Sequence, residues 1–114
     1  MKFPVMKIFL LGSSKSQVLE MISEKEIHKI HLDAHTVALV RAGESFYAFQ
    51  ADCPHRGASL FQGLLTESEE IVCPIHEYRF DYKTGELRAG SCGDLKIYPT
   101  ELTEKGLKVS ISSS

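Results

Sequence analysis

Two short stretches of this sequence, Cys53-Pro54-His55-Arg56-Gly57 and Cys73-Pro74-Ile75-His76, determine how the rest of the chain is interpreted. Each stretch begins with a cysteine that is followed directly by a proline and, two or three residues on, by a histidine. Both stretches come after a predicted strand, so each is expected at the tip of a loop. Two such loops facing each other would bring two thiols and two imidazoles together. The sequence therefore predicts a metal site formed by Cys53, His55, Cys73 and His76.

The mixture of thiolates and imidazoles indicates which metal centre is favoured. A [2Fe–2S] cluster can take both sulfurs on one iron and both nitrogens on the other, and neutral imidazole then raises the reduction potential. The alternative is a structural zinc site, because two cysteines and two histidines are a familiar zinc ligand set. Zinc fingers group cysteine with cysteine and histidine with histidine, whereas each pair here combines one of each. This order favours the iron–sulfur cluster.

The remaining sequence predicts an all-β fold with one short N-terminal helix. Residues 14–17 form a capping-box pattern, which predicts that a helix begins there. The residues of 107–111 alternate between apolar and polar, as expected for a half-buried strand. Short strands separated by turns are typical of an antiparallel β-sandwich or barrel. The strands are expected at residues 6–11, 27–32, 37–41, 46–49, 70–72, 78–82, 95–98 and 107–111.

Length and composition limit the class of protein. The chain has 114 residues, so we expect residues 1–114 to form a single domain. The formal net charge of −2 and the lack of a basic stripe argue against nucleic-acid binding. No apolar run approaches the ~20 residues of a membrane span. The first eleven residues resemble a signal peptide, but Lys7 interrupts them and no small-x-small cleavage site follows. We therefore expect a soluble, cytoplasmic protein.

Cys-x-His, then the 17 residues 56–72, then Cys-x-x-His is the signature of the Rieske family. The chain resembles Rieske ferredoxins and the Rieske domain of ring-hydroxylating oxygenases. The resemblance continues at Tyr47-Ala48, Arg79-Phe80-Asp81 and Thr84-Gly85-Glu86, and it covers Val37 to Ile111, whereas the first thirty residues carry little of it. It implies a Rieske-type sandwich with a two-loop cluster-binding subdomain, and one [2Fe–2S] cluster held by the four residues named above.

Several positions depart from the high-potential members of this family. Respiratory and photosynthetic Rieske proteins carry an extra cysteine in each loop, and these cysteines form a disulfide; the equivalent residues here are Ala58 and Ile75. High-potential members also have hydroxyl donors two and four residues after the last histidine ligand. This chain has Tyr78 and Phe80 there; Phe80 has no hydroxyl, and the hydroxyl of Tyr78 is expected to lie too far out to reach a sulfur. We therefore expect a potential near the low end of the Rieske range of about −150 to +300 mV. The third loop, Ala89–Asp94, lacks the prolines common in the family.

The resemblance implies a soluble one-electron carrier rather than an enzyme. It implies a flavoprotein reductase as electron donor and an oxygenase as acceptor. The oxygenase reaction itself requires a separate iron with two histidines and one carboxylate, and the chain has no second domain to house it. The alternative function is an accessory small subunit of a larger oxidoreductase, such as assimilatory nitrite reductase. A third class, a sensor or structural module, also remains open.

Four further residues could suggest other sites. His28, His31 and His35 lie on a predicted strand and turn, where they would not all face one way, so we expect them on a solvated surface. Cys92 has no partner nearby in the sequence and is expected to be an ordinary free cysteine, with a redox-active thiol as the alternative.

Overall fold

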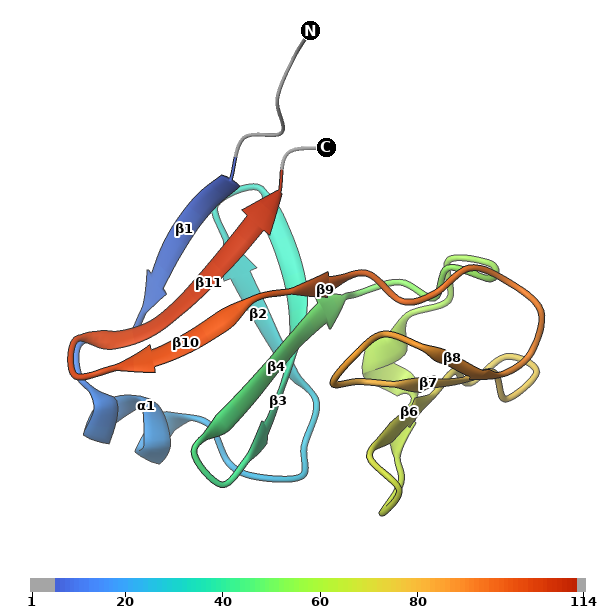
Figure 1. Ribbon diagram of the computed structural model, residues 1–114, viewed down its shortest axis with the longest axis horizontal. Coiled ribbons are helices and arrows are strands. Elements are labelled where there is room, and N and C mark those ends of the chain that lie inside the picture. The colour runs from blue at the N-terminus through green and yellow to red at the C-terminus, as the bar shows by residue number, and fades with distance from the viewer. Residues whose placement is uncertain (1–5, 113–114) are drawn as a thin grey trace, which may run out of the picture.

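The computed structural model describes residues 6–112 and confirms the predicted all-β class (Figure 1). Apart from one α-helix and one short 3₁₀ helix, the regular elements of this part of the chain are strands. In chain order the elements are β1 (Met6–Leu11), α1 (Lys15–Met21), β2 (His28–Leu32), β3 (His35–Ala42), β4 (Ser45–Gln50), η1 (Leu60–Gln62), β5 (Leu64–Leu65), β6 (Glu70–Val72), β7 (Arg79–Asp81), β8 (Leu87–Ala89), β9 (Ile97–Tyr98), β10 (Thr100–Thr103) and β11 (Gly106–Ser112).

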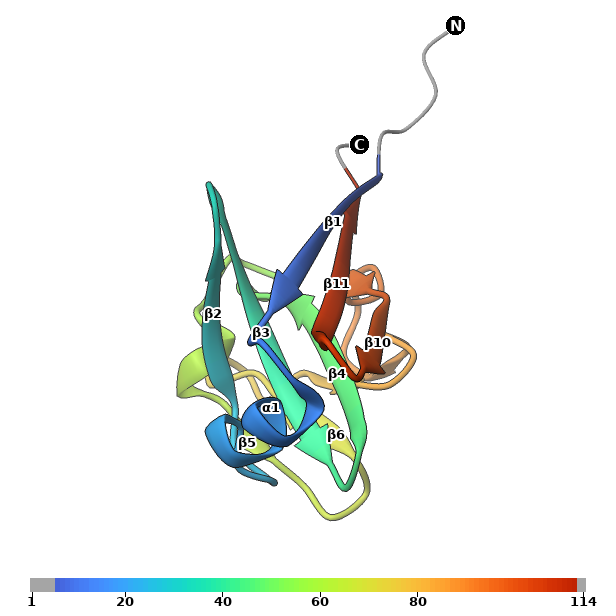
Figure 2. The same cartoon turned by 90° about the vertical axis from the view of Figure 1, so that its left-hand side faces the viewer.

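The strands form three antiparallel sheets. Their orders are β1-β11-β10, β2-β3-β4-β9 and β5-β6-β7-β8. The first two sheets lie against each other, and the third projects to one side with the loops that follow β4 and β6 (Figure 1). Helix α1 covers the lower end of the first two sheets, as Figure 2 shows. The resulting molecule is a sandwich of two sheets with a smaller subdomain attached, as the resemblance implied.

Strand β3 is buried on both faces, and this places two cores on either side of one sheet. Val37 and Leu39 belong to one core, and Ala38 and Val40 belong to the other. The first core fills the space between the first two sheets and consists of Val18, Ile22, Leu32, Val37, Leu39, Phe46, Ala48, Leu107, Val109 and Ile111. The second core lies under the third sheet and consists of Ala38, Val40, Phe49, Cys53, Leu60, Ile71, Cys73, Phe80, Tyr82 and Leu95.

Pro99 marks a corner between the sheets. The sequence predicts one strand over residues 95–98, but the structure forms only β9 there, which pairs with β4 through Tyr98 and Ala48. After Pro99 the chain continues as β10, which pairs with β11 in the first sheet. Proline cannot donate a ladder hydrogen bond, so the change of sheet occurs at the residue that would interrupt a continuous strand. The strands β5, β8 and β10 were not predicted.

Helix α1 begins at the predicted position, but its cap differs in one detail. The Ser14 hydroxyl accepts a hydrogen bond from the Gln17 backbone N–H at 3.1 Å, as a capping box requires. The Gln17 carboxamide oxygen accepts instead from the backbone N–H of Ser13, one residue earlier than predicted. The helix buries Val18 in the first core.

Residues 1–5 of the stretch compared with a signal peptide lie outside the described residues. The rest of that stretch is β1, which pairs along its length with β11. Within residues 6–112, no helix is both long and apolar enough to cross a membrane.

Candidate metal centre

The two cysteine–histidine stretches fold into loops that are closed in the same way. The Cys53 backbone N–H donates to the Ala58 carbonyl at 2.7 Å, and the Cys73 N–H donates to the Tyr78 carbonyl at 2.8 Å. In both loops the bond joins a cysteine to the residue five positions later. The first loop is also fastened by a bridge between Asp52 and Ser59. Each histidine therefore projects from a short loop whose cysteine lies at the base.

Both loops need left-handed backbone at their turns. Gly57 has φ = 71°, which costs little because glycine lacks a Cβ. In the second loop His76 and Glu77 take φ values of 62° and 52°. Two consecutive non-glycine residues in this region are energetically unfavourable, and such backbone is typical of sites where the surroundings impose the conformation. The strain lies at one of the predicted ligands.

The two thiols lie together inside the second core. Cys53 is 2% exposed and Cys73 is 1% exposed. Burial raises the pKa of the Cys53 thiol and the neighbouring Cys73 thiol raises it as well, whereas the backbone N–H groups of His55 and Arg56 lower it. Two neighbouring buried thiols would have to lose their protons to bind a metal, and a cation beside them would stabilise both thiolates.

The two imidazoles lie side by side on the outer side of the loops. The ring centroids of His55 and His76 are 5.5 Å apart, with an angle of 56° between the planes. His55 is half-buried and His76 is exposed. Burial lowers the pKa of His55, and the charges of Arg56 and His76 lower it further, which favours the neutral imidazole that binds metals.

One atom at this site is buried without a partner, and it is a potential metal ligand. Nδ1 of His55 has no hydrogen-bond partner although it is buried. Buried polar atoms are normally satisfied, because an unmade hydrogen bond costs about 1–3 kcal/mol. A bond from Nδ1 to a metal would remove this cost, so the residues present fit a metal centre at this position.

The arrangement is two pairs of ligands rather than one group of four. Within the described residues, no three His, Cys, Asp or Glu side chains converge on a point where a single metal ion could bind. A tetrahedral zinc site needs four ligands around one ion. A two-iron cluster needs one pair of ligands at each end. The buried thiol pair and the more exposed imidazole pair of this chain match the needs of the two-iron cluster.

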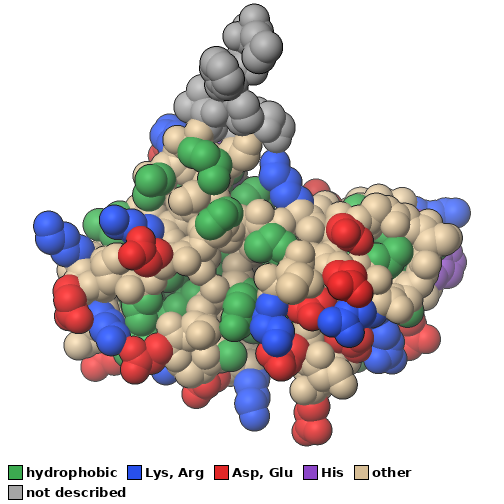
Figure 3. Space-filling model, viewed as in Figure 1, with side chains coloured by type: hydrophobic (Ala, Val, Ile, Leu, Met, Phe, Trp, Pro, Cys, Tyr) green, Lys and Arg blue, Asp and Glu red, His purple; other side chains and the backbone are tan. Residues whose placement is uncertain are grey.

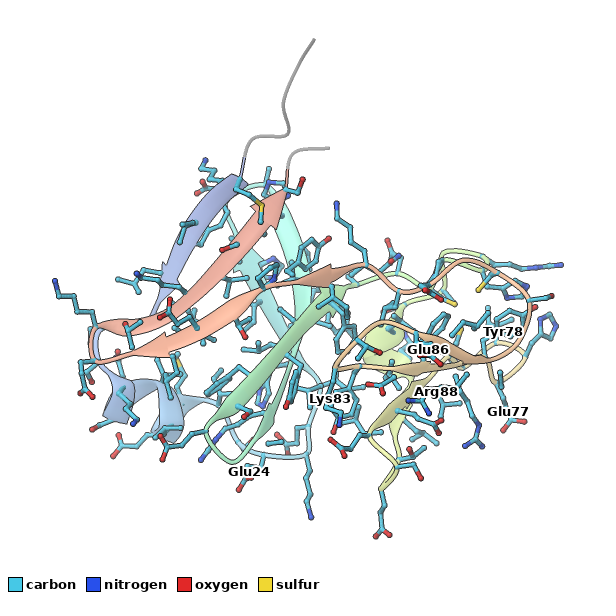
Figure 4. All side chains as sticks on the ribbon, in the orientation of Figure 1. Glu24, Glu77, Tyr78, Lys83, Glu86 and Arg88 are labelled. Carbon is cyan, nitrogen blue, oxygen red and sulfur yellow. The ribbon has the colours of Figure 1, made fainter. Side chains whose placement is uncertain are left out.

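Tyr78 and the third loop complete the site. The Tyr78 ring stacks on His55 with centroids 4.0 Å apart and only 12° between the planes. Its hydroxyl lies 3.4 Å from Oγ of Ser91 in the third loop. Figure 4 shows Tyr78 inside the curve of this loop, with Glu77 pointing outward. From the sequence, Tyr78 was considered only as the residue that stands where high-potential members have a hydroxyl donor, and its stack on His55 was not predicted. The aromatic ring two residues after His76 was the signal for this stack.

The three other candidate histidines do not join this centre, whereas Cys92 packs against the core that contains Cys53 and Cys73. Nε2 of His28 contacts the Ser23 carbonyl at 2.9 Å, Nδ1 of His31 contacts the Thr36 hydroxyl at 3.2 Å, and His35 packs edge-on to Phe9. The three histidines therefore do not converge, as predicted. Cys92 packs against the second core and donates to the Gly93 carbonyl at 3.2 Å. Burial raises the pKa of its thiol, as expected for an unreactive cysteine.

The surface of the third sheet carries charges of both signs. Arg79 contacts Glu70 at 3.4 Å, and Arg88 contacts the buried Asp81 at 2.8 Å. Figure 3 shows acidic and basic side chains interspersed over this part of the molecule, with a histidine at its outer end.

Comparison with known proteins points to the same centre. The sequence profile of the Rieske [2Fe-2S] domain matches residues 14–99. This match begins earlier than Val37, where the resemblance was expected to begin, and therefore includes α1 and β2. The ferredoxin component of the naphthalene 1,2-dioxygenase/salicylate 5-hydroxylase systems of Ralstonia sp is 33% identical over 74% of this chain and 81% of that protein.

Solved structures with similar folds include two ferredoxins of carbazole 1,9a-dioxygenase. The one from Nocardioides aromaticivorans IC177 has a TM-score of 0.74 and 27% identity, covering 95% of this chain and 97% of that chain. A chain in a complex of reduced oxygenase and oxidized ferredoxin has a TM-score of 0.73 and 26% identity, covering 90% and 92%. A nitrite reductase small subunit from Mycobacterium tuberculosis has a TM-score of 0.73, at 18% identity and coverages of 99% and 100%, which shows a shared fold.

Proposed function

The chain belongs to the Rieske [2Fe-2S] family and holds one [2Fe–2S] cluster, and on this premise we propose that it is a one-electron carrier that delivers electrons to an oxygenase. We propose Cys53, His55, Cys73 and His76 as the cluster ligands. The observation that carries this proposal is the pair of identically closed loops, which places a buried thiol pair beneath a more exposed imidazole pair.

The residues of the two loops have distinct roles in this proposal. When bound, the cluster supplies a centre that accepts and releases one electron. The two thiolates hold one end of the site inside the second core, away from solvent. The imidazoles of His55 and His76 hold the other end, and the exposed His76 brings the site to the surface, where a partner protein can approach.

The proposed partners are an oxygenase as electron acceptor and a flavoprotein reductase as electron donor. Similar proteins are the ferredoxin components of dioxygenase systems, and one such ferredoxin is found in complex with its oxygenase. The chain is an electron carrier and not itself an enzyme. This follows from the family match and from the ferredoxin components of dioxygenase systems that the chain resembles.

A low reduction potential is part of the proposal. Phe80 is fully buried in the second core and has no hydroxyl to donate to a cluster sulfur. Tyr78 has a hydroxyl, but it lies against Ser91 in the third loop. Neither position therefore supplies the hydrogen bond that raises the potential in high-potential Rieske proteins. A low potential suits delivery of electrons from a flavin to an oxygenase.

The compartment and the domain organisation are also proposed. We assign residues 1–114 to one Rieske domain, since the two cores share the sheet that contains β3 and β4. The cytoplasm is the proposed location, because a reducing compartment disfavours disulfides and so keeps the sulfurs of Cys53 and Cys73 available as cluster ligands.

The function can be tested with purified protein. We expect about two iron atoms and two sulfides per chain, and, after reduction, the EPR spectrum of a [2Fe–2S] cluster with mixed nitrogen and sulfur ligands. The reduced protein should be reoxidised rapidly by a dioxygenase component supplied with substrate. One zinc per chain without iron, after anaerobic purification, would overturn the ligand assignment.

Binding measurements separate the carrier from the alternative, an accessory subunit of a nitrite reductase. A carrier should bind its partner transiently, with an association rate that falls as salt rises. A permanent subunit should instead co-purify with a larger enzyme in a stable, salt-resistant complex. The fold alone allows both functions, and the sequence match to dioxygenase ferredoxins favours the carrier.

A further inference from the structure

The two imidazoles at the metal centre are held very differently. The Tyr78 ring covers one face of His55 in an almost parallel stack, 4.0 Å between centroids. Among the described residues, the ring of His76 contacts only the ring of His55, at a tilted angle. His55 is half-buried, whereas His76 is exposed. The orientation of the His55 plane is therefore restricted by an aromatic side chain that is not itself a ligand.

Tyr78 is in turn supported by the third loop. Gly90 has φ = 123°, and a Cβ built on it would lie 2.4 Å from Cδ2 and 2.6 Å from Cγ of Tyr78. No side chain fits at that separation, so the Gly90 backbone rests directly against the ring. Ser91 lies next to the Tyr78 hydroxyl, at 3.4 Å between the oxygens. His55, Tyr78 and Gly90 thus form three consecutive layers from three separate loops.

We propose that Tyr78 is a positioning residue, which fixes the plane of the His55 imidazole, and that Gly90 is required because it lets the third loop support the Tyr78 ring. This inference rests on the proposed role of His55 as a cluster ligand. Residues around a metal ligand set its orientation and thereby tune the metal. The third loop therefore controls the electronic environment of the centre although it supplies no ligand.

The test compares two glycines of the same loop. At Gly90 an added methyl group would collide with Tyr78, whereas at Gly93 it would meet nothing within 4 Å, and Gly93 has no left-handed φ. We expect Gly90→Ala to shift the g values of the reduced protein and to shorten the half-life of the visible absorbance in chelator. The shortening should be about two- to tenfold, the range that corresponds to the loss of an aromatic pair. Gly93→Ala should match the wild-type protein in both measurements.

Variants of Tyr78 distinguish positioning from general destabilisation. Tyr78→Ala should reproduce the g-value shift of Gly90→Ala. Tyr78→Phe keeps the aromatic ring, so it should show the wild-type spectrum. Adding Gly90→Ala to Tyr78→Ala should cause little further change in the g values, because the ring that the methyl group would displace is gone. An equal shift from Gly90→Ala in both backgrounds would overturn the proposal, because the shift would then not act through Tyr78.

Iron analysis separates this inference from the proposed function. Wild-type protein with about two irons per chain, together with unchanged spectra in Tyr78→Ala and Gly90→Ala, would overturn the positioning role and leave the carrier function intact. Wild-type protein that takes up no iron would overturn the carrier function, and the inference with it.

Discussion

The first and second cores lie on opposite faces of the same sheet, yet they are filled differently. The first core consists of aliphatic and aromatic side chains from α1 and the first two sheets. The second contains Cys53, Cys73 and Tyr82 among its buried residues, and it lies under strands of only two or three residues. Apolar burial can stabilise the first core without a metal. The second core encloses two predicted ligands, so its stability should depend on what they bind.

The largest difference between the cores should appear when a ligand is removed. We expect Cys73→Ser to hold no cluster and to lose the visible absorbance completely. Without the metal bonds, the loops that carry the ligands should open more often, so amide hydrogen exchange should accelerate in residues 51–95. Exchange in α1 and β11, which enclose the first core, should stay slow.

Cys92→Ser is the matched control for this experiment. Cys92 packs against the same core, but its sulfur contacts only the Gly93 carbonyl among the described hydrogen bonds. This variant should retain its full iron content and its exchange pattern. Loss of iron from Cys92→Ser, or faster exchange in β11 of Cys73→Ser, would contradict the division into two independent cores.

A cavity in the first core should lower the stability of the protein and leave the cluster intact. Leu107 is fully buried there, on β11 between its partners on β1 and β10. We expect Leu107→Ala to lower the free energy of unfolding by about 2–5 kcal/mol, as large-to-small core substitutions do. The EPR spectrum should not change, because the ligand loops pack on the other face of the sheet. Urea unfolding followed by circular dichroism measures the first effect.

Leu60→Ala provides the counterpart in the second core. Leu60 is also fully buried, but it packs with Cys53 and Cys73. Its substitution should cost a similar free energy, about 2–5 kcal/mol, and should also accelerate loss of the cluster in chelator. If both leucine variants lose the cluster at the same rate, the two cores unfold as one unit.

A smaller effect is expected from the one buried carboxylate of the third sheet. Asp81 accepts hydrogen bonds from the backbone N–H groups of Lys83 and Thr84 and from Arg88. Asp81→Ala should lower the free energy of unfolding by about 1–3 kcal/mol, because these donors lose their acceptor in a partly buried turn. Arg88→Ala should cost about 0–1 kcal/mol, since the arginine side chain is 46% exposed and Asp81 keeps its two backbone donors. The exposed Glu86, 3.6 Å from Arg88, is the control, and Glu86→Ala should change nothing measurable.

The difference between the two cores also explains which strands could be predicted from the sequence. Alternation at Leu107, Val109 and Ile111 predicted β11, because a seven-residue strand that places every second side chain in one large core has a clear period. The strands β5 and β8, which were not predicted, contain two and three residues, too few for any period to appear. The apolar run Val37–Val40 predicted a strand. The burial of its second face depends on the third sheet, whose strands come later in the sequence.

The metal centre shows a similar limit. The residue types and their spacing predicted all four proposed ligands, because the chemistry requires thiol and imidazole pairs on two loops. The stack of Tyr78 on His55 joins residues from different loops, and its support by Gly90 comes from a third. Such contacts follow from how the loops pack together, which no local pattern encodes. The left-handed backbone at His76 and Glu77 has the same origin.

The last prediction concerns the reduction potential, and it tests the effect of a hydroxyl group that the second core lacks. Phe80 occupies the position where high-potential members of the family place a tyrosine, and it lies in the same core as both cysteines. A hydroxyl there can donate a hydrogen bond to a sulfur. Such a bond strengthens when the cluster gains negative charge, so it stabilises the reduced state and raises the potential. A hydrogen bond to a charged group contributes about 1.5–3 kcal/mol in total.

Only the part that strengthens on reduction counts, and we take it as about 1–2 kcal/mol of that total. For one electron, about 1.4 kcal/mol corresponds to 59 mV, so Phe80→Tyr should raise the midpoint potential by about 40–90 mV. Tyr78→Phe should leave the potential unchanged, because it removes a hydroxyl that faces Ser91 rather than a sulfur. Protein-film voltammetry at neutral pH measures both variants. If Phe80→Tyr retains its cluster but shows the wild-type potential, the missing hydroxyl is not what keeps this centre at low potential. A wild-type midpoint above about +100 mV, in the upper part of the Rieske range, would contradict the low-potential assignment itself.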